Sequence, residues 1–366
     1  MKLLEPYQLG NITLKNRVVM APMTRSRAIN NVPNDLMITY YSQRAGAGLI
    51  ISEGIAPSPN ALGYARIPGL YNQKQIEGWK KITEAVHRKG SKIFAQLMHT
   101  GRISHPDNMP KDAVILAAST LKSAGTMWTD KNGAQSYPMA KEMTIKDIHN
   151  TIEEFVQSAK NAIASGFDGV EIHAGTGFLL DTFINPHTNL RTDEYGETLE
   201  GRMKFTLEVT KKVADAIGKE KTSIRISPYG VFNDMGLYDK TDEAFEYLVS
   251  ALNKIGVIYI HMVDHSSIGA PEVSVTLKEK IKTTLYQGTY ISSGGFDSEK
   301  AQWEVDSHKG DLVAFGKPFI SNPDLVDRIK NGDEFAKSDS DTHYSIGKEG
   351  YTDYPISEKK SILFKL

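Results

Sequence analysis

Short apolar runs recur along the chain, and amphipathic stretches separate most of them. The runs are rich in Val, Ile, Leu and Phe, which is typical of buried strands. Eight of them occupy residues 17–21, 49–52, 92–97, 169–173, 223–227, 257–261, 289–292 and 311–315. Apolar residues at spacings of three and four predict helices over 76–88, 148–165 and 204–217.

This alternation of strand and helix predicts a parallel sheet. Eight continuously apolar strands without an obvious edge strand favour a closed (β/α)8 TIM barrel, with an open doubly wound sheet as the alternative. The stretch from about 104 to 143 breaks the alternation and is rich in Pro, Ala, Ser, Thr and Gly. Because barrels carry function in their βα loops, we expect one domain over 1–366 with a capping insertion after the third strand.

Composition narrows the classes of function. Apolar residues make up 40% and charged residues 24%, as in soluble globular proteins with a large core. The net charge of -1 gives no general attraction to nucleic acid or to an anionic membrane. No apolar run is long enough for a signal segment or a membrane span, so we expect a cytoplasmic protein.

The chain contains no cysteine, which excludes disulfides, thiolate nucleophiles, iron–sulfur clusters and thiolate zinc sites. A redox role therefore needs an organic cofactor or a non-thiolate metal. The ten histidines form no close set that predicts a metal site. Gly46 and Gly48 precede a strand and lack the third glycine of a dinucleotide fingerprint, so a Rossmann site is not expected.

Reactive groups of a barrel belong at the C-terminal ends of its strands. The residues there are Pro22, Met23, Thr24, Glu53, Gly54, Gln96, Met98, His99, His173, Arg225, Gly294, Gly295, Gly316 and Lys317. Arg225 lies within an apolar run, so it predicts an anionic partner, either a ligand or a structural carboxylate. Glycine turns after the last two strands are the common phosphate site of this fold, although an ordinary turn has the same sequence.

Taken together, these segments resemble the Old Yellow Enzyme family over nearly the whole chain. The resemblance is carried by LKNRVVMAPMTRSRA (14–28), YYSQRAGAGLIISEG (40–54), FAQLMHTGR (94–102), GFDGVEIH (166–173), NLRTDEYG (189–196), DLVAFGKPFISNPDL (311–325) and GYTDYP (350–355). It implies a barrel with tightly held FMN. It also implies NADPH or NADH as co-substrate in a ping-pong reaction through flavin N5.

The resemblance also implies roles for residues of the cofactor site. Thr24, after Pro22 and Met23, would lie near the flavin C4 carbonyl. Gly54 and Gln96 would follow the pyrimidine edge, and Arg225 would lie beside N1 and the C2 carbonyl. The phosphate would be held by Gly294, Gly295, Gly316 and Lys317. The family usually has Arg where this chain has Lys317, which keeps the charge but loses bidentate binding.

The implied substrate site departs from the family pattern. Its residues would be Tyr64, Met98, His173, Thr176, Phe178 and Tyr351. Family members usually read H-x-A-[N/H]-G-Y after the fourth strand, where His and Asn or His bind the substrate carbonyl and Tyr delivers a proton to carbon. This chain has Thr176 at the second carbonyl-binding position and Phe178 in place of the Tyr. Thr176 can donate one hydrogen bond, and Phe178 has no hydroxyl to donate. The alternative is that both side chains only pack. Met98 stands where many members have Trp, which predicts a wider pocket.

The predicted function is therefore an FMN-dependent NAD(P)H oxidoreductase that reduces activated alkenes, quinones and nitro compounds. Because Phe178 cannot protonate carbon, we rank general electrophile reduction above efficient enoate reduction. Two alternatives stay open from sequence. One is a redox-neutral isomerase of an unsaturated carbonyl on reduced FMN, and the other is a flavin-binding protein with little turnover. The oligomeric state, monomer or homodimer, is open as well.

Overall fold

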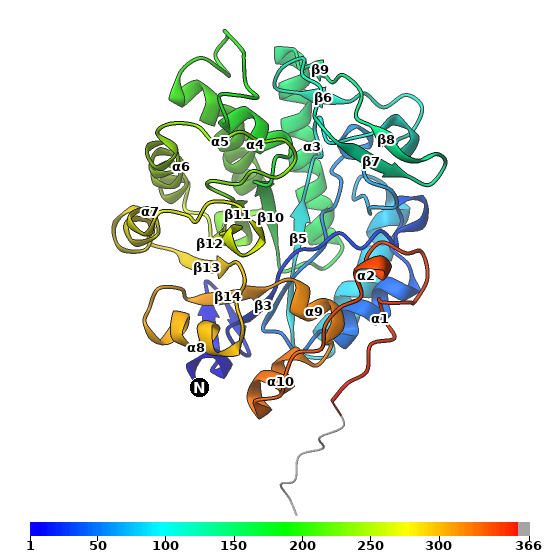
Figure 1. The fold of residues 1–366 in the computed structure, drawn as a ribbon, viewed down its shortest axis with the longest axis vertical. Coiled ribbons are helices and arrows are strands. Elements are labelled where there is room, and N and C mark those ends of the chain that lie inside the picture. Colours follow the sequence, from blue (N-terminus) through cyan, green and yellow to red (C-terminus); the bar gives the residue numbers. More distant parts are fainter. Residues whose placement is uncertain (358–366) are drawn as a thin grey trace, which may run out of the picture.

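Eight parallel strands close into a barrel in the computed structural model, which describes residues 1–357 (Figure 1). In barrel order they are β3 (Val18–Met20), β4 (Leu49–Ile51), β5 (Lys92–Leu97), β10 (Gly169–Ala174), β11 (Thr222–Ile226), β12 (Tyr259–Val263), β13 (Thr289–Ser293) and β14 (Leu312–Phe315). Each strand overlaps one predicted apolar run, and β14 pairs with β3 to close the ring. The barrel is confirmed over the open sheet.

Ten helices in the described part of the chain connect and surround the strands. They are α1 (Asp35–Gln43), α2 (Gln73–His87), α3 (Ile145–Ala164), α4 (Leu179–Ile184), α5 (Leu199–Ile217), α6 (Thr241–Ile255), α7 (Val275–Lys280), α8 (Ser298–Asp306), α9 (Lys317–Ser321) and α10 (Leu325–Asn331). Asn72 and Gln75 form a capping box, so α2 begins three residues before the apolar periodicity predicts. No helix within residues 1–357 combines the length and apolarity of a membrane span.

Side chains inside the barrel alternate with those that face the helices, as the pleat requires. The barrel interior is apolar towards the N-terminal ends of the strands, where the Phe94 and Tyr259 rings lie 5.5 Å apart. A Cβ atom at Gly169 would lie 2.4 Å from the Phe94 ring, so glycine makes room for that ring. The hairpin of β1 (Tyr7–Leu9) and β2 (Ile12–Leu14) packs against the same cluster and was not predicted from the sequence.

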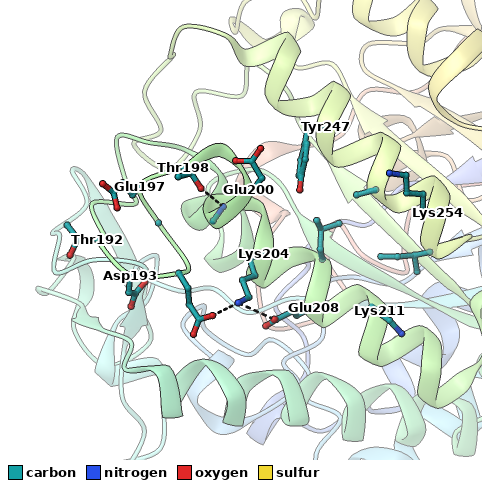
Figure 2. A pocket seen from close by; sticks show the side chains of 16 residues that line it. Thr192, Asp193, Glu197, Thr198, Glu200, Lys204, Glu208, Lys211, Tyr247 and Lys254 are labelled. Carbon is teal, nitrogen blue, oxygen red and sulfur yellow. Dashed lines mark hydrogen bonds and ion pairs between the residues drawn. The ribbon is translucent and has the colours of Figure 1, made fainter.

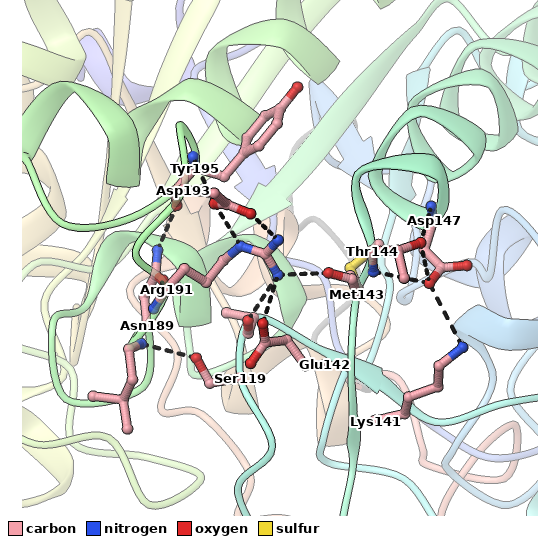
Figure 3. A network of polar contacts seen from close by, with 12 residues as sticks. Ser119, Lys141, Glu142, Met143, Thr144, Asp147, Asn189, Arg191, Asp193 and Tyr195 are labelled. Carbon is pink, nitrogen blue, oxygen red and sulfur yellow. Dashed lines mark hydrogen bonds and ion pairs between the residues drawn. The ribbon is translucent and has the colours of Figure 1, made fainter.

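The predicted insertion lies between β5 and α3 and forms two small sheets. These sheets pair β6 (Leu116–Ala117) with β9 (Lys141–Glu142), and β7 (Thr126–Thr129) with β8 (Gly133–Ser136). Arg191 ties the insertion to the loop before α5 (Figure 3). Its Nη1 donates to the Ala118 carbonyl at 3.1 Å and to the Met143 carbonyl at 2.6 Å, while Nε donates to Asp193 at 3.0 Å.

The C-terminal segment returns to α1 and is held there by buried arginines (Figure 1). Arg25 Nη2 donates to the Gly350 carbonyl at 2.7 Å, and Arg44 Nη2 donates to the Tyr351 carbonyl at 3.2 Å. Arg27 Nη2 donates to the Glu349 carbonyl at 2.9 Å. Main-chain carbonyls of one short segment therefore satisfy several guanidinium groups at once.

Candidate functional site

A polar layer lies above the apolar interior, towards the C-terminal ends of the strands. It is formed by Gln96, Glu171, His173, Arg225 and His261. The register pairs Glu171 with Gln96 across β10 and β5, and pairs Arg225 with both His173 and His261 across β11. Side chains far apart in the sequence thus meet in the C-terminal half of the barrel interior.

Glu171 is the centre of this layer and is fully buried. Gln96 Nε2 donates to Glu171 Oε1 at 2.9 Å, and His261 Nδ1 donates to Glu171 Oε2 at 2.9 Å. Burial lowers the pKa of His261, and the Glu171 carboxylate opposes that shift. His261 is therefore a neutral imidazole whose Nδ1 carries the proton.

Arg225 is the cation of this layer, and one of its donors is unused. Its Nε is buried and has no hydrogen-bond partner among the described residues. Burial lowers the pKa of Arg225, and the nearby Glu171 and Tyr259 oppose that shift. Glu171 is thus the structural carboxylate that acts on this cation. A guanidinium with a buried, unused N–H fits the anion or carbonyl edge of a ligand such as flavin.

His173 lies beside Arg225 and is a neutral donor or acceptor. Burial holds its pKa well below the usual range, and the charge of Arg225 lowers it further. Its Nδ1 has no hydrogen-bond partner within residues 1–357. A neutral imidazole can donate one hydrogen bond to a substrate carbonyl without adding a net charge.

The loop after β10 holds Thr176 in a strained conformation. Its φ of +61° lies in the left-handed region, which is costly for a β-branched residue. The loop is fixed from both sides, because Thr176 N donates to Ser227 Oγ at 2.7 Å and Asn233 Nδ2 donates to the Thr176 carbonyl at 2.6 Å. The backbone at 176 is therefore set by its neighbours.

An apolar wall follows that loop. The Phe178 ring lies edge-on to His173 with centroids 5.2 Å apart, and Tyr64 lies 6.0 Å from Phe178. Met98 belongs to the same cluster. A Cβ atom at Gly54 would lie 2.5 Å from Met98 Sδ, so the two strand ends are in direct contact. The structure thus brings together five residues predicted for the site.

The glycine turn after β13 requires glycine at both positions. Gly294 has a φ of +140°, and a Cβ atom there would lie 2.1 Å from the Asp264 carbonyl oxygen. Gly295 has a φ of +66°, and its Cβ would lie 2.5 Å from Ser267. A turn with such backbone freedom lets amide N–H groups approach an anion. The residues present therefore fit a phosphate-bearing cofactor.

The remaining predicted residues lie around this turn or away from it. The Cβ position of Gly316 is 3.7 Å from Met23 Sδ, which joins the ends of β14 and β3. Lys317 is exposed, Met23 and Thr24 are half-buried, and Pro22 is buried. Tyr351 is fully buried and stacks on Tyr40 at 4.1 Å, in contact with Arg25 and Arg27. These contacts place it with the C-terminal segment.

Sequence reasoning missed Glu171, His261 and Asn233. The first two are polar residues inside apolar runs, GVEIH and YIHMV, which is the same signal that singled out Arg225. Asn233 lies in an irregular loop and carries no such signal. Within residues 1–357, no group of three or more acidic residues and histidines is arranged to hold a metal ion.

A separate hollow of about 810 Å³ lies on the outer surface between α5 and α6 (Figure 2). Lys204 extends across it and pairs with Glu194 and, at 3.9 Å, with Glu208. These charges are paired and largely open to solvent, so they contribute little beyond local electrostatics. The hollow contains none of the predicted site residues.

Comparison with known proteins gave consistent matches. Residues 2–335 match the model of the NADH:flavin oxidoreductase / NADH oxidase family. The chain is 39% identical to a chanoclavine-I aldehyde reductase of Penicillium roqueforti, over 97% of this chain and 96% of that one. It is 39% identical to 12-oxophytodienoate reductase 1 of Oryza sativa subsp. japonica, over 98% and 93%. A structure of morphinone reductase with tetrahydroNAD matches with a TM-score of 0.92 and 37% identity, over 98% of each chain.

Proposed function

The chain belongs to the NADH:flavin oxidoreductase / NADH oxidase family, the Old Yellow Enzyme family of the sequence resemblance, and on this basis we propose its reaction and the residues that carry it. The protein is an FMN-dependent oxidoreductase that uses NAD(P)H to reduce electron-poor small molecules, activated alkenes among them. The observation that carries this conclusion is the match to named reductases over nearly the full chain.

FMN, when bound, supplies a two-electron carrier between NAD(P)H and the substrate. We assign its isoalloxazine ring to Pro22, Met23, Thr24, Gly54, Gln96 and Arg225, and its phosphate to Gly294, Gly295, Gly316 and Lys317. Arg225 stabilises negative charge on the reduced ring, and its unused Nε supports that role. We treat residues 1–366 as one FMN-binding domain with residues 104–143 as its cap.

Substrate binding is assigned to the wall beside this ring. His173 donates a hydrogen bond to the substrate carbonyl or nitro oxygen, which withdraws electrons from the carbon that accepts hydride. Thr176 adds one hydroxyl with a shorter reach than Asn or His. Tyr64, Met98, Phe178 and Tyr351 are the further proposed contacts, and the ring of Phe178 against His173 supports this wall.

Proton supply separates the possible substrates. Reduction of an alkene ends with a proton on the α carbon, and Phe178 has no hydroxyl to provide it. Quinones and nitro compounds protonate on oxygen or nitrogen, which exchange protons with water. We therefore place these electrophiles ahead of enones in rate, with alkene reduction slower and dependent on water or another donor.

The likeness to proteins named as reductases supports reduction over isomerisation on reduced FMN or flavin storage. The tetrahydroNAD complex of morphinone reductase supports a nicotinamide as the electron donor, without choosing between NADH and NADPH. We further propose a cytoplasmic protein, either a monomer or a homodimer. The near-neutral net charge supports the absence of nucleic-acid and anionic-membrane partners.

The test is anaerobic. The purified protein is expected to be yellow, to release FMN on denaturation, and to be reduced by NADH or NADPH. The reduced protein is then mixed with cyclohexenone, a nitroarene and a quinone while flavin reoxidation is followed. Reoxidation by at least one of these electrophiles is expected. Colourless protein that takes up no added FMN, or reduced protein that none of them reoxidises, would reject the proposal. A cis enal returned only as its trans isomer would favour the isomerase.

A further inference from the structure

Glu171 lies on β10, between the strands of Gln96 and Arg225, two residues that we assign to FMN. Its carboxylate is fully buried and bonded to Gln96 and His261, each at 2.9 Å, and its charge acts on Arg225. A buried carboxylate is costly to desolvate, and an apolar residue would fit the apolar run of β10 without that cost. The contacts of Glu171 point to a role that depends on its charge.

We propose that Glu171 is a positioning residue that orients the Gln96 amide, offsets part of the Arg225 charge, and thereby lowers the reduction potential of bound FMN. The inference rests on the proposed function, because it takes Gln96 and Arg225 as contacts of the flavin ring. Glu171 itself acts through these two residues.

Glu171 fixes the orientation of the Gln96 amide. A carboxylate only accepts hydrogen bonds, so Gln96 must present Nε2 to Glu171 and leave its own Oε1 free to accept from a ligand. The main chain is fixed at the same residue, because Gln96 N donates to Ser52 Oγ at 3.0 Å. A glutamine at position 171 both donates and accepts, so it would no longer enforce one orientation.

The charge of Glu171 also lies close to Arg225, because Glu171 is bonded to His261, and His261 is the direct strand neighbour of Arg225. Arg225 would stabilise the negative charge that appears when the flavin is reduced, and the negative charge of Glu171 opposes that effect. Neutralising Glu171 leaves Arg225 uncompensated, so the reduced form is favoured and the potential rises. Removing the His261 donor has the opposite effect, because the carboxylate then carries its charge with less compensation.

The experiment measures the midpoint potential of bound FMN against a reference dye in three variants. Glu171→Gln is expected to favour reduced flavin at least tenfold, which is a rise of about 30 mV for a two-electron couple. His261→Phe, which keeps an aromatic ring but removes the donor, is expected to lower the potential. The matched control is Asp168→Asn, which removes a carboxylate just before the same strand, paired with Lys92 and His87. Its potential should equal that of the wild type.

The outcomes are separable. A raised potential in Glu171→Gln, or a lowered one in His261→Phe, with Asp168→Asn unchanged, supports the proposal, and either variant suffices if the other does not fold. FMN-loaded variants with the wild-type potential, or with shifts of the opposite sign, overturn it. In that event the wild type still binds FMN and oxidises NAD(P)H, so the proposed function stands. Failure of the wild type in those two assays would reject the function itself.

Discussion

Arg191 and Arg225 are two cations withdrawn from bulk water in different ways. Arg191 lies at the rim of the barrel, which is the insertion and the loop before α5. Its Nε, Nη1 and Nη2 all donate to protein groups, namely the Asp193 carboxylate and two main-chain carbonyls (Figure 3). At the barrel centre, Arg225 has a buried Nε without a partner in the described chain. An arginine whose N–H groups all donate to the protein stabilises the fold, whereas one with a buried, unused N–H can still donate to a ligand.

The same contrast extends to backbone and packing. Outside the barrel, α2 and α3 begin with capping boxes, and Arg191 and Lys204 are paired with carboxylates. Around the centre, Thr176 is held in a left-handed conformation. Phe178 stands where the family resemblance implies a proton-donating tyrosine. Thr176 with its left-handed backbone, the unused Nε of Arg225 and the unused Nδ1 of His173 all lie where we place the chemistry, and such features are common in functional sites. Substitutions in both regions can sharpen this distinction.

The largest expected effect is on flavin reduction in Arg225→Ala. Loss of the cation should slow reduction by NAD(P)H about 10² to 10³-fold, the usual consequence of removing one charge-stabilising donor. Stopped-flow absorbance under anaerobic conditions measures it. Thermal unfolding of the FMN-loaded variant should change less than in Arg191→Ala. An unchanged rate with FMN still bound would count against the assigned role of Arg225.

Arg191→Ala should instead act on stability. Removal of the side chain leaves the Ala118 and Met143 carbonyls without their donor, so we expect a loss of about 3 kcal/mol in the free energy of unfolding. Urea unfolding measures it. The matched control is Lys204→Ala, whose exposed pairs should be worth about 1 kcal/mol or less. The comparison of the two arginines fails if Arg191→Ala shifts the FMN potential without loss of stability.

Phe178→Tyr should change rate selectively. The new hydroxyl offers a proton to the α carbon, so reoxidation by cyclohexenone should speed up by about 10²-fold, the lower end for positioned donors. Thr176 limits the gain because its short side chain holds the carbonyl less firmly, and Thr176→Asn in the same chain should extend it. Reoxidation by a quinone should be nearly unchanged. Equal gains with both oxidants would show that position 178 does not face the α carbon.

The smallest effect is expected from Thr176→Asn alone. Asparagine tolerates the left-handed region better than a β-branched residue, so the variant should be more stable by about 1 kcal/mol. Urea unfolding of matched protein samples measures the difference. Thr176→Ser, which removes the methyl group and keeps the hydroxyl, should fall between the two. A loss of stability in Thr176→Asn would mean that its larger side chain clashes in the loop.

Patterning predicted the barrel because buried parallel strands appear in sequence as continuous apolar runs. The strand in the run 257–261 begins at Tyr259 and extends to Val263, since residues 257 and 258 still belong to the turn after α6. The first hairpin was missed because its three-residue strands are only partly buried and form no continuous apolar run, whereas the equally short β3 and β4 are buried at every position. Short strands that are only partly buried carry too little periodicity to detect.

The site was predicted less completely, and for a different reason. The residues at the strand ends included Arg225 and His173. Glu171 was missed because it is a single acidic residue within an apolar run, and that run alone does not show which way the side chain points. Whether a polar residue in a strand faces the barrel interior or a helix depends on register, which appears only when the strands are paired. The left-handed conformation of Thr176 likewise depends on Ser227 and Asn233, which lie far along the chain.

The arginines that bind the C-terminal segment have a consequence for how the chain is made. Arg25, Arg27 and Arg44 emerge early from the ribosome, whereas the carbonyls of residues 349–351 that they bind are translated more than 300 residues later. Until then these guanidinium groups must stay hydrated or occupy other partners. The first quarter of the barrel therefore acquires its native surroundings only near the end of synthesis, and a nascent chain halted before Glu349 should be cut more readily by protease around α1.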